Sequence, residues 1–238
     1  MGLLCGALAA PAPAAAQSMP GVRDLFTQAA GDVRRLVSAD SAVILSIGGV
    51  AAAVGHANDR HTSDAMARSD ALKHVFGIGD TVGGARMQAA GALATYTIGR
   101  VASNDTVARI GADLIRAQIV TQALTGAVKT AVGRTRPDGM QYSFPSGHAA
   151  ATFASATVLQ RNLGWKVGVP AYAVAAYVAT SRVQVRRHFL SDVTFGAALG
   201  IAAGRTVTIG RGSRRFALAP TAVPGGGGLT VSWVGNRN

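Results

Sequence analysis

Ser-Arg-Val-Gln-Val-Arg-Arg-His-Phe-Leu-Ser-Asp occupies residues 181–192 and brings three chemically useful side chains into one short segment. His188 and Asp192 are four residues apart, so on a helix they would lie on one face and could meet. A carboxylate beside an imidazole fixes the ring tautomer and stabilises its cation, which prepares the other nitrogen to attack an electrophile. Arg182 adds a planar cation that suits a phosphate. Alone, the segment fits a structural His–Asp pair as well as a catalytic one.

An earlier segment supplies two more cations. Lys129 lies near the expected end of a long helix, and Arg136 follows seven residues later, directly before Pro137. Pro137 disfavours the helical conformation at Arg136, so the chain turns there and can aim both cations at one point. The alternative is a basic helix end that interacts with its own dipole.

The segment Phe-Pro-Ser-Gly-His, residues 144–148, precedes an alanine-rich run. We expect Ser146 to cap a helix there, and backbone N–H groups at a helix N-terminus bind anions. Gly147 lets an oxyanion approach the backbone, and His148 in the first turn could act as a general acid. An ordinary capped helix with a surface histidine would contain the same residues.

Together, the three segments resemble the signature of the type-2 phosphatidic acid phosphatase and vanadium haloperoxidase superfamily. The pattern is Lys-x6-Arg-Pro, then Pro-Ser-Gly-His, then Ser-Arg-x5-His-x3-Asp, in the family's order over residues 129–192. The resemblance implies an all-α helical bundle and a phosphatase that hydrolyses phosphate monoesters without a metal or other cofactor. Vanadate would then be an inhibitor.

The resemblance also implies a role for each signature residue. His188 would attack phosphorus and form a phosphohistidine, with Asp192 orienting its ring. His148 would protonate the leaving oxygen and then activate water. Five residues would hold the phosphoryl oxygens: Lys129, Arg136, Ser146, Gly147 and Arg182.

Composition restricts the partners. The chain has 238 residues, of which 49% are hydrophobic, and a net charge of +12, which indicates one well-buried domain with an anionic partner. No nucleic-acid-binding module is recognisable, so we expect a phosphorylated small molecule or lipid as substrate, with membrane association as an option and no nucleic acid. Two alternatives stay open. One is a vanadium-dependent haloperoxidase, with vanadate as prosthetic group, and the other is a non-enzymatic basic envelope protein.

Three regions are expected along the chain. Residues 1–16 have an apolar run and then small residues, typical of a signal peptide, which predicts export to the cell envelope or periplasm. Residues 21–208 should form the helical phosphatase domain, with about six core helices. Residues 211–238 contain a basic segment and two alternating apolar stretches, which predict a β-hairpin.

Helical patterns are expected in the ranges 21–37, 41–55, 87–99, 104–133, 147–160, 167–181 and 189–206. The run Ser41–Gly55 is the best membrane-spanning candidate, but it is shorter than the roughly 20 apolar residues that a span needs. We therefore favour a compact helical bundle, soluble or resting on a membrane, over a polytopic protein.

Residues 58–80 are polar and predict a loop or short helices that could form a wall of the site. Three histidines lie in or beside this region and match no zinc pattern, so we predict no metal site: His56, His61 and His74.

Overall fold

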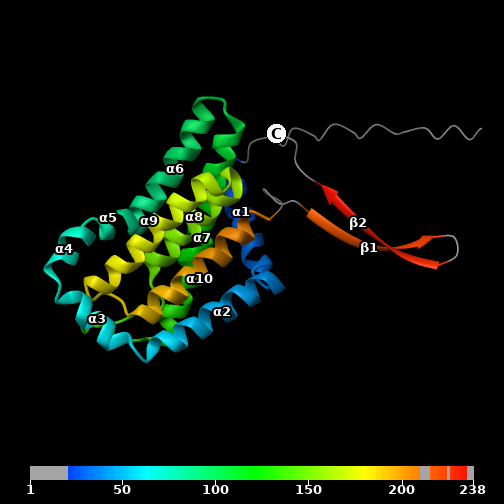
Figure 1. Ribbon diagram of the computed structural model, residues 1–238. Helices are drawn as coiled ribbons and strands as arrows, with labels where there is room; N and C mark the ends of the chain where they lie inside the picture. The colour runs from blue at the N-terminus through cyan, green and yellow to red at the C-terminus, as the bar shows by residue number, and fades with distance from the viewer. Residues whose placement is uncertain (1–20, 210–214, 224–225, 235–238) are drawn as a thin grey trace, which may run out of the picture.

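The structure is a computed structural model that describes residues 21–209, 215–223 and 226–234. In these ranges ten helices precede two strands (Figure 1). The helices are α1 (Val22–Arg35), α2 (Ala39–His56), α3 (Asp59–Ala67), α4 (Asp70–Phe76), α5 (Gly79–Gly83), α6 (Ala85–Val101), α7 (Asp105–Val132), α8 (Gly147–Leu163), α9 (Trp165–Gln184) and α10 (Leu190–Val207). The all-α body of the prediction is confirmed.

Six helices form the bundle, and they are the ones with 17 or more residues: α2, α6, α7, α8, α9 and α10. Helix α8 packs against α7, α9 and α10, and α10 also packs against α2 (Figure 1). The expectation of about six core helices therefore matches the long helices, while α1 and α3–α5 are shorter additions.

Small residues bring the helices that carry the site close together. A Cβ atom on Gly200 of α10 would lie 2.2 Å from the carbonyl oxygen of Ala150 on α8. Such a separation is far below van der Waals contact, so only glycine permits this helix spacing. The stretch after His148 is alanine-rich for the same reason, and Ala150 and Ala151 are fully buried.

The ends of the central helices follow the sequence signals. Helix α7 begins after Asn104, whose Oδ1 accepts from the Val107 N–H at 3.1 Å, and it ends at Gly133 with φ of +60°. Helix α8 begins after Ser146, whose Oγ accepts from the Ala149 N–H at 3.4 Å. The cap at Ser146 and the helix range 104–133 were predicted, because each cap uses residues only a few positions apart.

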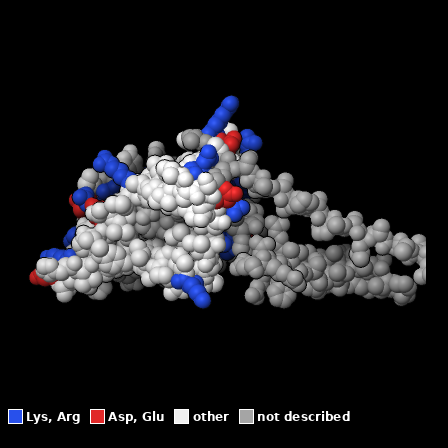
Figure 2. All heavy atoms as spheres, turned by 90° about the horizontal axis from the view of Figure 1, so that it is seen from above, with Lys and Arg blue, Asp and Glu red and all other residues white. Residues whose placement is uncertain are grey.

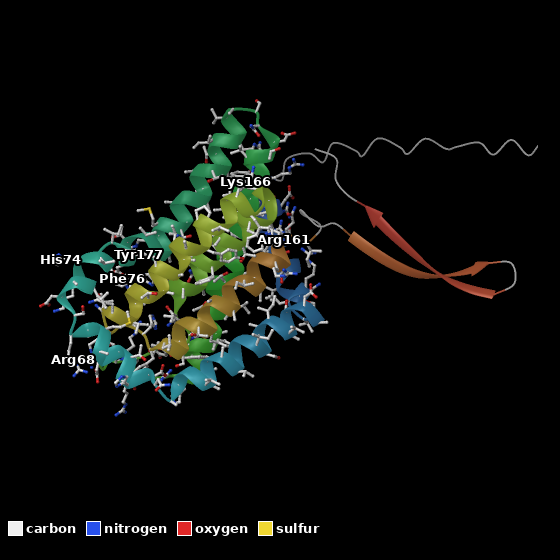
Figure 3. The ribbon with its side chains drawn as sticks, viewed as in Figure 1. Arg68, His74, Phe76, Arg161, Lys166 and Tyr177 are labelled. Carbon is white, nitrogen blue, oxygen red and sulfur yellow. The ribbon has the colours of Figure 1, made fainter. Side chains whose placement is uncertain are left out.

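The short helices α3, α4 and α5 lie at one end of the bundle, beside α9 (Figure 1). Phe76 of α4 packs on Tyr177 of α9 with ring centroids 5.2 Å apart (Figure 3). The Tyr177 hydroxyl also donates to the carbonyl oxygen of Val75 at 2.5 Å. Residues 58–80 are thus short helices fastened to the bundle, which is one of the two forms expected for them.

The C-terminal strands β1 (Arg215–Val223) and β2 (Gly226–Val234) pair antiparallel, with Phe216 opposite Trp233. Their side chains and the connecting residues 224–225 lie outside the described part. Packing of the hairpin against the domain therefore stays a prediction. The predicted signal peptide, residues 1–16, also lies outside the described residues.

Part of the surface is apolar and uncharged. In Figure 2 wide areas without Lys, Arg, Asp or Glu lie between scattered, mainly basic side chains. Helix α2 is, among the described helices, the one long and apolar enough to cross a membrane. Its exposed apolar residues recur at helical spacing, with exposed fractions of 57–70%: Val43, Ile47, Val50 and Val54.

Candidate active site

The segment 181–192 connects two helices and is not itself one helix. Arg182 lies in the last turn of α9, the chain turns at Arg186 with φ of +57°, and α10 begins at Leu190. His188 therefore precedes the helix that carries Asp192. The two residues therefore do not share one helix, because the turn ends α9 before His188, but their side chains still approach each other to 3.7 Å.

The His188 ring is held by a backbone carbonyl. Its Nδ1 atom lies 2.7 Å from the carbonyl oxygen of Ser143 and 3.7 Å from Oδ2 of Asp192. A carbonyl oxygen can only accept, so Nδ1 carries the proton and Nε2 keeps its lone pair. Burial lowers the pKa of His188, which favours the neutral ring, and Asp192 opposes this shift.

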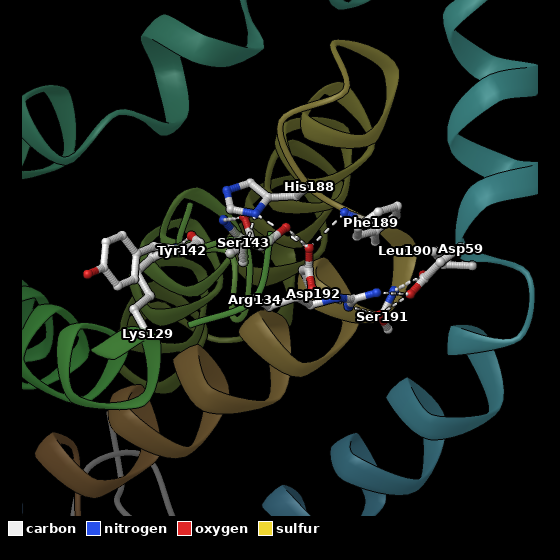
Figure 4. A network of polar contacts seen from close by, with 12 residues as sticks. Asp59, Lys129, Arg134, Tyr142, Ser143, His188, Phe189, Leu190, Ser191 and Asp192 are labelled. Atoms are coloured by element: carbon white, nitrogen blue, oxygen red, sulfur yellow. Dashed lines mark hydrogen bonds and ion pairs between the residues drawn. The ribbon is translucent and has the colours of Figure 1, made fainter. Parts of the chain in front are cut away.

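Asp192 is the centre of a hydrogen-bond network (Figure 4). Its carboxylate accepts from the hydroxyl of Ser143, from the Phe189 N–H at 2.8 Å and from the Arg134 guanidinium at 2.6 Å. Burial alone would raise the pKa of Asp192, but its partners His188, Ser143, Phe189 and Arg134 together lower it below its usual range. The carboxylate is therefore a stable anion behind the His188 ring.

Arg134 extends this network away from the histidine (Figure 4). Its guanidinium bonds Asp59 at 2.7 Å and the Ser191 hydroxyl at 2.7 Å, and it stacks on Phe189 with 4.3 Å from Cζ to the ring centroid. Sequence reasoning missed Arg134, Asp59 and Ser143. A second arginine two positions before Arg136 was a visible signal for Arg134. No sequence signal pointed to Asp59 or Ser143, because the residues that they contact are distant in sequence.

The signature cations of α7 and the following turn face the same region. Lys129 Nζ donates to the carbonyl oxygen of Tyr142 at 2.6 Å. Burial, and then the charge of Arg136, lower the pKa of Lys129 to about 8, while Asp192 opposes this shift. The charges of Lys129 and Arg136 also lower the pKa of His188, so both cations act on that ring.

Among the described residues three arginines have a buried Nε atom without a hydrogen-bond partner, and two of them, Arg136 and Arg182, belong to the signature, whereas Arg161 lies near the other end of α8. Arg182 as a whole is 5% exposed. A buried donor without an acceptor costs about 1–3 kcal/mol, and more for a charged group. Such donors fit a site that is completed by an anionic ligand.

His148 and Arg182 contact the same carboxylate oxygen. Its Nε2 atom is 3.0 Å from Oδ1 of Asp80, and the same oxygen is 2.5 Å from Nη1 of Arg182. Burial, and then the charge of Arg182, lower the pKa of His148 to about 4, while Asp80 opposes the shift. The charge of His188 also lowers the pKa of His148. Asp80 was not among the predicted site residues.

The helix N-terminus at α8 is tied to the same network. The Ser146 N–H donates to the carbonyl oxygen of Asp192 at 3.0 Å, and its hydroxyl caps the helix. Gly147 begins α8, where backbone N–H groups have no partner within the helix. The structure therefore brings the predicted signature residues of α7, α8, α9 and α10 to one end of the bundle.

Two hollows adjoin the network. The first, of about 480 Å³, is basic and includes Arg60, Arg134 and Arg136 in its lining. The second, of about 340 Å³, is mostly apolar and runs beside α2, lined by Gly49, Ala52, Ala53, His56, Val132, Arg134, Phe144, Ser191 and Phe195. His56 and Arg134 line both hollows, so the basic and apolar spaces meet.

The histidines outside the signature have other partners. His56 Nδ1 lies 3.0 Å from Oδ2 of Asp59, which joins it to the Arg134 network. Within the part of the chain that the structure describes, no three metal-ligating side chains gather at one point.

Comparison with known proteins finds a family match mostly in the second half of the chain. Residues 111–215, which contain all three signature segments, match the family model described as the PAP2 superfamily. This segment belongs to the PAP2 superfamily. It includes α7 from residue 111 onward and all of α8, α9 and α10, the helices that carry the signature residues.

Curated relatives of the PAP2 segment are named phosphatases. Over 85 residues the chain is 42% identical to a lipid A 1-phosphatase of Porphyromonas gingivalis, covering 34% of this chain and 19% of that protein. Over 107 residues it is 35% identical to a decaprenylphosphoryl-5-phosphoribose phosphatase of Mycobacterium tuberculosis, covering 40% and 59% respectively. The chain thus spans less than two thirds of these relatives.

Comparison with solved structures finds a weak similarity to a protein of the same family type. It is a transmembrane PAP2 type phosphatidylglycerolphosphate phosphatase from Bacillus subtilis, 21% identical, with a TM-score of 0.46. The match covers 78% of this chain and 92% of that chain.

Proposed function

We propose that this protein is a phosphatase that hydrolyses phosphate monoesters through a phosphohistidine on His188. The observation that carries the proposal is the pair of buried, unpartnered Nε–H donors of Arg136 and Arg182 in the same site as a neutral imidazole. Tetrahedral oxyanions such as phosphate match these donors. Family membership and the names of the relatives support the same reaction class.

In the first step, the Nε2 lone pair of His188 attacks phosphorus while the bond to the leaving oxygen breaks. The Ser143 carbonyl keeps the proton on Nδ1, and Asp192 stabilises the positive charge that develops on the ring. His148 gives its proton to the leaving oxygen, which departs as an alcohol.

In the second step, water attacks phosphorus as His148 takes its proton, and the N–P bond of His188 breaks to release inorganic phosphate. His148 is neutral above a pKa of about 4 in the empty site. A bound phosphate places negative charge beside the ring, which raises the pKa and lets the ring carry the proton that the first step needs.

Positive charge for the reaction comes from the chain itself. Lys129, Arg136 and Arg182 would surround the phosphoryl oxygens, with the N-terminus of α8 adding its N–H groups. Each charge-assisted contact contributes about 1.5–3 kcal/mol, so three or four could supply most of the roughly 8 kcal/mol that a 10⁶-fold acceleration requires. The mechanism therefore needs no divalent ion, and we expect activity to persist in a chelator.

We further infer an amphiphilic phosphate as substrate. Its phosphoryl group would lie among Lys129, Arg136 and Arg182, and Arg136 also lines the basic hollow, which meets the apolar one. The apolar hollow lies beside α2, whose outer face is apolar and exposed. An acyl or isoprenyl chain would fit the hollow, and the exposed face of α2 would associate with a membrane. The relatives named for lipid A and for a decaprenylphosphoryl compound support this substrate class.

The test uses the full chain with an aryl phosphate and with phosphatidic acid in mixed micelles. His188→Ala should abolish hydrolysis and the acid-labile phosphoenzyme trapped after brief exposure to labelled substrate. The matched control is His74→Ala, an exposed histidine of α4, which should retain activity. Substantial hydrolysis by His188→Ala would refute the proposal, as would activity that a chelator removes and added metal restores.

A further inference from the structure

One carboxylate oxygen lies close to two groups that the proposed reaction uses. Oδ1 of Asp80 lies 2.5 Å from Nη1 of Arg182 and 3.0 Å from Nε2 of His148. In the proposed mechanism Arg182 binds a phosphoryl oxygen, and His148 faces the leaving oxygen. Asp80 thus presents an anionic oxygen to the donors that would hold the substrate.

We propose that Asp80 sets the anion affinity of this site: its carboxylate takes the place of a phosphoryl oxygen when the site is empty, and phosphate binds by displacing it. The inference rests on the proposed function, because that function assigns Arg182 and His148 to the phosphoryl group. Carboxylate and phosphate oxygens compete for the same donors, and two anions that share them repel each other.

The exposure of Asp80 allows its side chain to rotate away from Arg182 and His148. The Asp80 side chain is 69% exposed, whereas that of Arg182 is 6% exposed. The carboxylate can therefore rotate into solvent while the arginine stays in place. The departing oxygen frees Nη1 of Arg182, whose Nε is already buried without a partner among the described residues. A phosphate oxygen can then accept from the Nη1 atom that the carboxylate had occupied.

The backbone of α5 does not need to move. Glycines fix this short helix against α9 and α8: a Cβ on Gly79 would lie 2.1 Å from Oγ of Ser181, and one on Gly83 would lie 2.2 Å from Cγ1 of Val178. The Cβ added at Gly83 would also lie 3.2 Å from Cδ2 of His148. The close contact keeps Asp80 at the site and restricts the displacement to its side chain.

Competition by Asp80 has a consequence for specificity. It weakens the binding of every anion that is held only by the groups around the phosphoryl oxygens, including the product phosphate. A substrate whose leaving group binds elsewhere, for example in the apolar hollow beside α2, gains affinity that Asp80 does not oppose. Asp80 thus shifts selection of the substrate from the phosphoryl group to the leaving group.

The experiment measures binding of inorganic phosphate to the full chain by titration calorimetry, together with inhibition of aryl phosphate hydrolysis by phosphate and vanadate. Asp80→Asn and Asp80→Ala should both lower the phosphate Kd and the two inhibition constants by about tenfold, equivalent to about 1.4 kcal/mol. Asp70→Asn is the matched control, because this substitution removes the same charge. Asp70 lies in neighbouring α4, where it pairs with Lys73. The substitution should leave these constants unchanged.

The outcomes separate this inference from the proposed function. Tighter phosphate binding by both Asp80 variants supports the inference even if the chain hydrolyses no ester. Unchanged or weaker phosphate binding overturns it even if hydrolysis is normal. A fall in kcat with unchanged inhibition constants also overturns it, because Asp80 would then be a positioning residue for His148. Circular dichroism should show both variants folded, and Asp80→Asn keeps the side-chain volume if Asp80→Ala does not fold.

Discussion

The Nδ1 atom of His188 lies 2.7 Å from the carbonyl oxygen of Ser143. This contact determines which nitrogen carries the proton, and a backbone carbonyl cannot lose that function by titration. Asp192, 3.7 Å from the same nitrogen, is left with a different task. It supplies a negative charge near the ring and holds the Ser143 hydroxyl, the Phe189 N–H and Arg134 in position.

Replacement of Asp192 should therefore cost less activity than in triads where the carboxylate selects the tautomer, where the loss is about 10⁴-fold. We expect Asp192→Asn to lower kcat by about 100-fold, because the positive ring loses one nearby charge while Ser143 still holds the tautomer. Single-turnover phosphoryl transfer measures the effect, and thermal unfolding checks that the variant is folded. A loss of 10⁴-fold or more in a folded variant would show that Asp192 selects the tautomer after all.

The pKa of Lys129, lowered to about 8 by burial and then by Arg136, predicts an alkaline limit to activity. Lys129 is a cation below this pKa and neutral above it, so kcat/KM should fall as the pH rises through about 8. Lys129→Arg keeps its charge throughout this range, so the decline should move to higher pH. Lys73→Arg, on exposed α4, is the control and should leave the profile unchanged. An alkaline decline that stays near pH 8 in Lys129→Arg would assign the limit to another group.

Filling the apolar hollow should affect only substrates with long apolar chains. Ala53 lines this hollow, whereas Ala51 is exposed on the same helix and does not line it. Ala53→Phe should lower kcat/KM for phosphatidic acid by about tenfold or more and leave aryl phosphate hydrolysis nearly unchanged, because one substrate needs the space and the other does not. Ala51→Phe should change neither rate. Equal losses on both substrates would place the apolar chain elsewhere.

The spacing of α8 and α10 should depend on Gly200. A methyl group there would meet the Ala150 carbonyl oxygen at 2.2 Å, so Gly200→Ala should lower the free energy of unfolding by about 1–3 kcal/mol. At Gly91 of α6 an added Cβ meets nothing within 4 Å, so Gly91→Ala should raise this free energy by about 0.5–1 kcal/mol. Urea denaturation of both variants gives the comparison. A neutral Gly200→Ala would mean that the two helices separate at little cost.

Most helix positions were predictable because their causes are local. Asn104 and Ser146 cap their helices through N–H groups three residues later, and Gly133 ends α7 in the left-handed conformation. The short helices after His56 were predicted less definitely, as loop or helix. Their positions depend on contacts with α9, such as that between Phe76 and Tyr177, which are about 100 residues apart in sequence and leave no local pattern.

The chemical groups of the site could be read from the chain alone, because the signature segments carry two histidines, an aspartate and three cations in fixed order and spacing. The pairing of those groups depends on how the helices pack in the folded protein. Asp80 meets Arg182 and His148, Asp59 meets Arg134, and the Ser143 carbonyl meets His188, each across 45 or more residues of chain. The physical reason is that a hydrogen bond depends on atoms a few ångströms apart in space. Close packing of small residues between the helices sets those distances, and sequence spacing does not.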